Sequence, residues 1–150
     1  MNYRSIIAIS LAIFSQSAFA ETCELSIEAN DMMQYNQSKF EISAAKCDKV
    51  KLNLTHVGKM PAASMGHNWV LTKTADKEAI ASAGIAAGAG KNYVPEGDAR
   101  VLAATKVIGG GENTSVTFET AALKVGGDYS FFCSFPGHSY VMKGKFIVNQ

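Results

Sequence analysis

The chain has 150 residues, of which 47% are hydrophobic and 18% are charged, and its formal net charge is +1. This length suits one ordinary domain that buries a substantial core. No linker, repeat or low-complexity segment divides the chain. Because the charge is close to neutral, neither a nucleic-acid partner nor an anionic membrane surface is expected.

Residues 1–20 have the pattern of a secretory signal peptide. Arg4 precedes an apolar stretch over residues 6–14, and the Ala-Phe-Ala sequence at residues 18–20 is typical of a cleavage site. The stretch is too short for a membrane helix, and no cysteine directly follows the cut, so no membrane anchor is expected. Cleavage removes one of 14 basic residues and none of 13 acidic ones, which leaves no formal net charge. The mature domain is predicted to span residues 21–150 and to be exported to an oxidising compartment.

Alternating polar and apolar residues predict strands through most of this domain. In residues 24–29, for example, Leu25 and Ile27 alternate with polar residues. Strand-like runs recur at residues 39–43, 50–55, 69–71, 101–105, 115–120, 129–135 and 143–149. About eight strands with Gly-rich turns are typical of an antiparallel Greek-key β-sandwich, so the fold class is predicted to be all-β.

One segment has a different pattern. Residues 76–89 are rich in alanine, and the spacing of Ile80 and Ile85 suits a short amphipathic helix. Gly84 and Gly88 weaken this helix. The sandwich is therefore predicted to carry one short helical insertion.

Residues 133–142, Cys-Ser-Phe-Pro-Gly-His-Ser-Tyr-Val-Met, contain three side chains that bind metals. The Pro-Gly pair reverses the chain between Cys133 and His138, and Met142 stands where the next strand begins. Thiolate and thioether are soft ligands and imidazole is borderline, a set that suits copper in both its cuprous and cupric states. This loop therefore predicts a copper site that lacks only a second imidazole.

Two other histidines could supply that imidazole. His67 follows Gly66 and, on a strand, would share a face with the core residue Trp69. His56 lies in a Leu-Thr-His-Val sequence and is expected to be a packed core histidine outside the site.

The Gly-His-Asn-Trp sequence at residues 66–69 and the distant Cys-x4-His-x3-Met motif, set in Phe-Phe-Cys-x-Phe-Pro-Gly-His-x-x-x-Met-Lys-Gly, resemble the azurins. These are the small blue-copper (cupredoxin) electron carriers of bacterial periplasms, and the resemblance covers essentially all of residues 21–150. It implies one type 1 copper ion per chain, one-electron transport in the periplasm and no enzymatic activity. It also implies redox partners such as c-type cytochromes or a copper reductase, and a chain that is monomeric or associates weakly.

The resemblance also assigns residues to the site. It makes His67, Cys133 and His138 the strong ligands, Met142 a weak axial ligand, and the carbonyl oxygen of Gly66 a distant contact on the other side.

Asn68 and Phe135 are implied to support these ligands. Their backbone N–H groups would donate to the Cys133 sulfur and tune the reduction potential. Asn68 would also connect the two ligand loops.

An apolar patch is implied where the His138 edge reaches the surface. Its members are Met60, Met65, Ile85, Phe135, Pro136 and Val141. Apolar loop residues also cover a metal and keep water out, but an exposed apolar patch is typical of a contact surface. This patch is therefore the expected docking site for redox partners.

Three cysteines in an exported protein suggest one disulfide and one free thiol. A bridge that used Cys133 would cap the only thiolate among the candidate ligands. The family pattern instead pairs Cys23 with Cys47 and leaves Cys133 free.

Other functions are open to the same residues. A copper storage or delivery protein would favour exposed, Met-rich sites, and Met32, Met33 and Met60 point weakly that way. A copper oxidase or reductase would need more histidines than this chain has. A cysteine hydrolase using Cys133 and His138 is disfavoured by the aromatic surroundings, and structural zinc is set aside only by the family resemblance.

Overall fold

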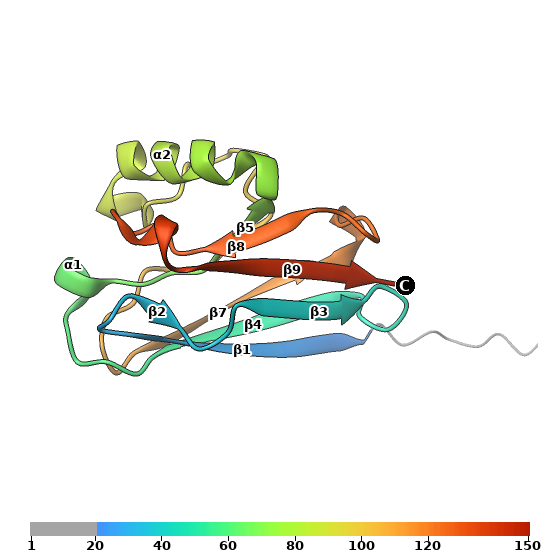
Figure 1. Cartoon of the computed structure of the whole chain (residues 1–150), viewed down its shortest axis with the longest axis horizontal. Helices are drawn as coiled ribbons and strands as arrows, with labels where there is room; N and C mark the ends of the chain where they lie inside the picture. The colour runs from blue at the N-terminus through green and yellow to red at the C-terminus, as the bar shows by residue number, and fades with distance from the viewer. Residues whose placement is uncertain (1–20) are drawn as a thin grey trace, which may run out of the picture.

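The computed structural model describes residues 21–150, which form two packed β-sheets with one helix on the outer face of the second (Figure 1). The first sheet has the strand order β2-β1-β4-β7 and the second the order β3-β9-β8-β5-β6. The strands are β1 (Thr22–Asn30), β2 (Gln34–Tyr35), β3 (Lys39–Ser43), β4 (Lys49–His56), β5 (Val70–Lys73), β6 (Ala103–Ala104), β7 (Asn113–Glu119), β8 (Tyr129–Phe132) and β9 (Lys143–Asn149). The predicted all-β sandwich with a helical insertion is confirmed.

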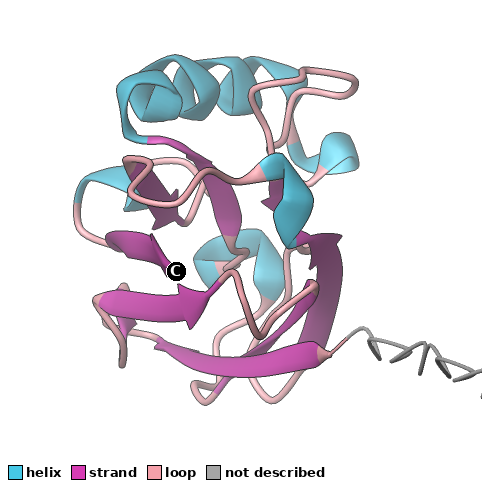
Figure 2. Cartoon of the chain, turned by 90° about the vertical axis from the view of Figure 1, so that its right-hand side faces the viewer, coloured by secondary structure: helices cyan, strands magenta, loops and turns pink. Residues whose placement is uncertain are grey.

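Besides the strands, residues 21–150 form two α-helices and four short 3-10 turns, and Figure 2 shows α2 (Lys77–Ala87) as the long helix at the top of the view. The insertion is α2, and a single turn, α1 (Ala62–Met65), was not predicted. Gly88 ends α2 with a φ of 76°, a left-handed value that glycine adopts without steric cost. Within residues 21–150, no helix is long and apolar enough to cross a membrane.

The pairing of the strands differs from the antiparallel arrangement that was expected. β1 pairs with β4 in parallel, and β3 pairs with β9 in parallel. The chain leaves the first sheet after β2, joins the second through β3 and returns through β4. The parallel pairs arise from this crossing, because neighbouring strands are then not joined by a tight turn.

Two predicted strands are shorter than expected. The strand predicted at residues 101–105 is only Ala103–Ala104, at the sheet edge beside β5. β8 ends at Phe132 and not at Phe135, because the chain turns away after the Cys133 N–H has bonded the Met142 carbonyl at 3.0 Å.

The core between the sheets is built from alternate residues of the strands. Trp69 is fully buried and stacks against Phe131 and Phe118, with ring centroids 5.8 and 6.1 Å away. All four residues of β8 are buried, because one face points into this core and Phe132, on the other, packs against Ile80 of α2. The aromatic residues of β8 thus pack both into the core between the sheets and against α2.

A disulfide joins Cys23 of β1 to Cys47, as expected, with the two Cα atoms 5.4 Å apart. The loop between β3 and β4 that carries Cys47 lies beside the C-terminus, at the end of the sandwich opposite α1 (Figure 1). Among the described residues, Cys133 is the free cysteine, and it is buried.

Replacing both Cys23 and Cys47 by alanine is expected to lower the free energy of unfolding by about 3 kcal/mol, because the bridge restricts the unfolded chain. Urea unfolding of the variant and of the oxidised parent measures this difference. The spectrum of the predicted copper site should not change, because the bridge lies at the opposite end of the sandwich from α1 and from the adjoining segment that carries His67. An unchanged midpoint would contradict the expectation.

Candidate metal centre

Three metal-binding side chains converge at the α1 end of the sandwich. His67 lies between α1 and β5, Cys133 follows β8, and His138 begins a short 3-10 turn, His138–Tyr140. The Cys133 Sγ atom lies 3.9 Å from Nδ1 of His67 and 3.6 Å from Nδ1 of His138. One ligand atom from each residue lies within 4.8 Å of the others, and all three residues are buried.

These distances suit one metal ion. Nitrogen and sulfur ligands bind metals such as zinc at about 2.0–2.3 Å, so atoms spread around one ion lie about 3.5–4 Å apart. Two imidazoles and a thiolate form the donor set of blue-copper sites.

The loop between β8 and β9 is shaped by its own backbone hydrogen bonds. Gly137 has a φ of 83°, which lets the chain turn before His138. The N–H of His138 donates to the Phe135 carbonyl at 3.0 Å, and that of Met142 donates to the His138 carbonyl at 2.8 Å. Met142 is fully buried beside the cluster, where its backbone carbonyl accepts the N–H of Cys133.

His67 is held both by its backbone and by its ring. Its backbone forms a two-way bridge with Ile108, with N···O distances of 3.0 and 2.9 Å. Its Nε2 atom lies 2.9 Å from the Asn30 carbonyl, which can only accept, so Nε2 carries the proton. The lone pair of Nδ1 is therefore free to face Cys133.

Gly66 allows the preceding chain to pass close to the cluster. A Cβ atom there would lie 2.5 Å from both the Ala62 carbonyl oxygen and a methyl group of Val107. The Gly66 carbonyl oxygen lies 4.0 Å from the Cys133 sulfur. Any side chain at this position would force the chain around it to shift.

Asn68 connects the two ligand loops. Its side-chain oxygen accepts the N–H of Ser134 at 2.8 Å, and its side-chain nitrogen donates to the Ser134 hydroxyl at 2.8 Å and the Asn92 carbonyl at 2.9 Å. The backbone N–H groups of Asn68 and Phe135 hydrogen-bond to the Cys133 sulfur, which lowers the pKa of that thiol.

Tyr35 is a contact that the sequence did not predict. Its hydroxyl donates to the carbonyl of Asn68, which ties β2 to the His67 segment. Burial raises the pKa of Tyr35 well above its usual value, and the nearby Cys133 raises that pKa further. Nothing local in the Gln-Tyr-Asn sequence distinguishes this tyrosine from an ordinary half-buried one.

Burial makes the three candidate ligands neutral before metal binds. It raises the pKa of the Cys133 thiol to about 11, beyond what the two backbone donors offset. It lowers the pKa of His67 to about 4 and also lowers the pKa of His138. Metal that binds at pH 7 therefore meets free imidazole lone pairs and must displace about one proton, from the thiol.

His56 is buried, as expected, and lies against His67 with ring centroids 4.5 Å apart. Its Nδ1 accepts the N–H of Gly58 at 3.0 Å, and its Nε2 lies 2.9 Å from the Met65 carbonyl. Both ring nitrogens are occupied, so His56 has none left for a metal.

The residues of the expected apolar patch are exposed to different degrees. Val141 is 61% exposed, Ile85 54% and Met60 38%, while Met65 and Phe135 are half-buried. Pro136 is also exposed. Tyr140, which was not predicted to belong, is 72% exposed beside Val141.

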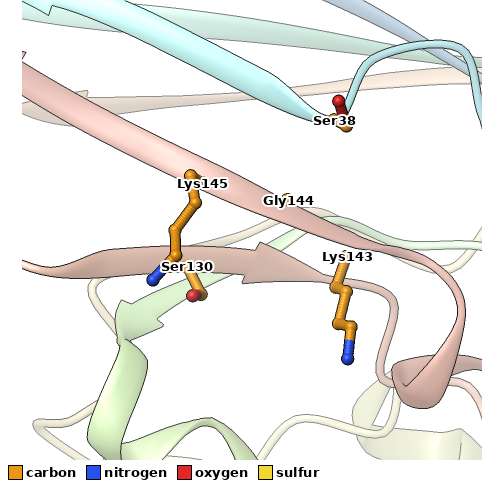
Figure 3. A pocket seen from close by; sticks show the side chains of 5 residues that line it. All are labelled: Ser38, Ser130, Lys143, Gly144 and Lys145. Carbon is orange, nitrogen blue, oxygen red and sulfur yellow. The ribbon is translucent and has the colours of Figure 1, made fainter.

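A hollow of about 250 Å³ on the outer face of the second sheet is lined by basic and hydroxyl side chains and not by metal-binding imidazole or thiol groups (Figure 3). It is lined by Ser38, Ser130, Lys143, Gly144 and Lys145. Lys145 is already paired with Asp128 at 2.7 Å. Ammonium groups do not ligate metals while protonated, so this hollow is not a second copper site.

A β-sandwich that buries two imidazoles and a thiol at one end has the site of the small blue-copper proteins. The family model for copper-binding proteins of the plastocyanin/azurin family matches residues 21–149, and the chain belongs to that family. The chain therefore binds one copper ion.

Individual relatives agree with this assignment. The azurin of Bordetella pertussis is 52% identical over 134 residues, which cover 89% of each chain. The azurin of Achromobacter denitrificans is 50% identical over 147 residues, or 98% of each chain. A solved azurin from Methylomonas sp. strain J superposes with a TM-score of 0.82 at 43% identity, covering 85% of this chain and 98% of its own.

Proposed function

We propose that this protein is a periplasmic one-electron carrier whose copper cycles between the cuprous and cupric states. The observation that carries the proposal is the burial of the donor set. His67 and Cys133 are 0% exposed and His138 is 3% exposed. A substrate cannot reach these buried ligand atoms, whereas an electron can tunnel through the side chains that cover them.

In this proposal His67, Cys133 and His138 would hold the copper, with weaker contacts from Met142 and the Gly66 carbonyl. Copper supplies the one-electron couple. The protein supplies a frame that does not change with oxidation state: the His67 ring is fixed by Asn30, and the His138 turn is closed by its own hydrogen bonds. A fixed frame keeps reorganisation small, which makes electron transfer fast.

Two alternative functions fit the burial less well. An enzyme needs an open coordination position for its substrate, and here buried groups surround the cluster. A storage or delivery protein needs ligands that exchange readily. Met32 and Met33 are 69% and 39% exposed, but the candidate ligands are buried.

The experiment that tests the proposal is a redox titration of the copper-loaded protein followed by absorption. An intense blue band that is bleached by a reductant and restored by an oxidant, with copper retained against a chelator, is expected. Rapid loss of copper to the chelator would favour delivery instead. A colourless cupric protein would contradict a blue-copper site.

Export is part of the proposal. The expected signal peptide, residues 1–20, lies outside the described residues, and the family pattern supports a mature domain of residues 21–150 in the periplasm. Recovery of a product that begins at Glu21 from the periplasmic fraction would test it.

We also place the docking of redox partners, such as c-type cytochromes or a copper reductase, on the apolar patch. Phe135, one member of this patch, packs against His138, with ring centroids 4.7 Å apart. A dry, weakly binding contact suits a carrier that must release its partner quickly.

Val141→Lys is expected to slow electron self-exchange by about tenfold, because two like charges would meet across the contact and raise its free energy by about 1.4 kcal/mol. The blue band should persist, because Val141 is exposed. Stopped-flow mixing of the reduced and oxidised forms gives the rate. Val125→Lys, at a 51% exposed site in the turn before β8, is the matched control. Equal rates in both variants would place the electron path on another face.

A further inference from the structure

A lysine is buried beneath the ligand loop and has no assigned role. Lys77 is the first residue of α2, and only 9% of its side chain is exposed. Lysine is almost never buried unless it is paired. A positive charge is also unfavourable at a helix N-terminus, where the backbone N–H groups already carry partial positive charge.

The ammonium group of Lys77 contacts both segments that carry the strong ligands of the loop. Its Nζ atom donates to the backbone carbonyl of Ser139, next to His138, at 3.3 Å. It also lies 5.7 Å from the ring centroid of Phe132, the residue before Cys133. One cation thus contacts a sequence neighbour of each strong ligand in the loop between β8 and β9, Cys133 and His138.

The balancing charge is on the solvent side. Lys77 is ion-paired with Glu78, whose side chain is 65% exposed. Water screens that carboxylate in part, while the ammonium faces the protein interior. The pair therefore produces a net positive electrostatic potential in the protein interior.

Packing alone does not explain the lysine. The contact of α2 with the sheet is already made by Ile80 and Ala81 against Val70 and Phe132. A methionine at position 77 would fill the same space without the cost of burying a charge.

We propose that Lys77 is a positioning and tuning residue of the copper centre: it fixes the His138 turn through the Ser139 carbonyl, and its buried charge favours cuprous over cupric copper. The second part rests on the proposed electron-carrier function. A nearby positive charge raises the energy of the more positive oxidation state, so its removal should favour cupric copper.

Lys143 provides a matched comparison. It follows Met142 directly, but its side chain is exposed and lines the hollow on the sheet face (Figure 3). Lys77→Met and Lys143→Met therefore each remove one positive charge close to the ligands, one buried and one in solvent.

The tuning is tested by equilibrating each copper-loaded variant with the same redox buffer. Lys77→Met should lower the ratio of cuprous to cupric protein about threefold, or about 28 mV in potential, and 0.5 M salt should not remove the effect. The effect of Lys143→Met should be smaller and should disappear in that salt. Equal, salt-sensitive effects of both variants would overturn the tuning role.

A second variant tests the tuning role even if the Lys77→Met protein does not fold. Glu78→Gln removes the exposed partner and should raise the same ratio, opposite in sign to the lysine change. No change, or a fall, would mean that the pair does not act on the copper.

The positioning is tested on the copper-free protein, so it does not depend on the function. The N–H groups of Val141 and Met142 both donate to the His138 carbonyl. Lys77→Met should speed their hydrogen exchange by about tenfold, and Lys143→Met should leave it unchanged. Unchanged exchange in Lys77→Met would overturn the positioning role, whereas a colourless wild-type copper complex with faster exchange in Lys77→Met would overturn only the electron-carrier function.

Discussion

Cys133→Ser is expected to abolish the blue absorption band completely. The band requires charge transfer from a thiolate to cupric copper, and Cys133 is the free thiol among the described residues. A serine hydroxyl in the same buried place cannot be deprotonated near neutral pH, so it offers only a weak neutral oxygen to a soft site. Absorption spectra of both proteins, each with one equivalent of cupric ion, measure the loss.

The same variant should also change the proton count. Burial holds the pKa of Cys133 at about 11, so the wild-type thiol is protonated at pH 7 and must lose its proton when copper binds. A pH-stat titration should record about one proton released per copper for the wild type, and almost none for Cys133→Ser. Zinc-loaded wild type is the control, because it should release the proton but stay colourless. A blue Cys133→Ser protein would exclude Cys133 as the source of the band.

Local sequence was sufficient for most strands. β3 and β9 have the predicted bounds, and β4 differs from its prediction by one residue at each end, because one face of each strand is buried and the alternation records that face. The alternation does not indicate which strand is the partner or whether the two strands run parallel. The parallel pairing of β1 with β4 was therefore missed.

The short β6 shows the same limit. The segment that carries β6 runs alongside β5, and the N–H groups of Leu102 and Thr105 donate to the carbonyls of Leu71 and Trp69. Only two residues pair as a strand. An edge segment is shaped by its neighbour, and residues 101–105 alone do not encode that contact.

The candidate site divides in a similar way. Cys133, His138 and Met142 lie on one turn, so their spacing and the Pro-Gly pair were enough to group them. His67 lies 66 residues away, and its assignment needed the family pattern. The contacts of Tyr35 and Lys77 join segments distant in the chain through single side chains of ordinary local sequence. Only the folded structure brings them to the site.

Asn68→Leu is expected to lower the free energy of unfolding of the copper-free protein by about 4 kcal/mol. Leucine has a similar volume, so the loss comes mainly from polar groups left without partners. The N–H and hydroxyl of Ser134 and the carbonyl of Asn92 would each lose a bond of 2.8 or 2.9 Å. An orphaned buried group costs about 1–3 kcal/mol. Urea unfolding, with the slope compared between variants, measures the change.

Asn113→Leu, at an exposed position on β7, is the matched control and should change stability by less than about 0.5 kcal/mol. The two ligand loops would also lose their link in Asn68→Leu, since the Asn68 side chain is what bonds the His67 segment to Ser134, next to Cys133. The backbone N–H of Asn68 would still reach the Cys133 sulfur, so the blue band should survive while copper leaves faster to a chelator. A protein as stable as the wild type would mean that the loops are held together by the packing around Cys133, and that the Asn68 side chain only fills the space between them.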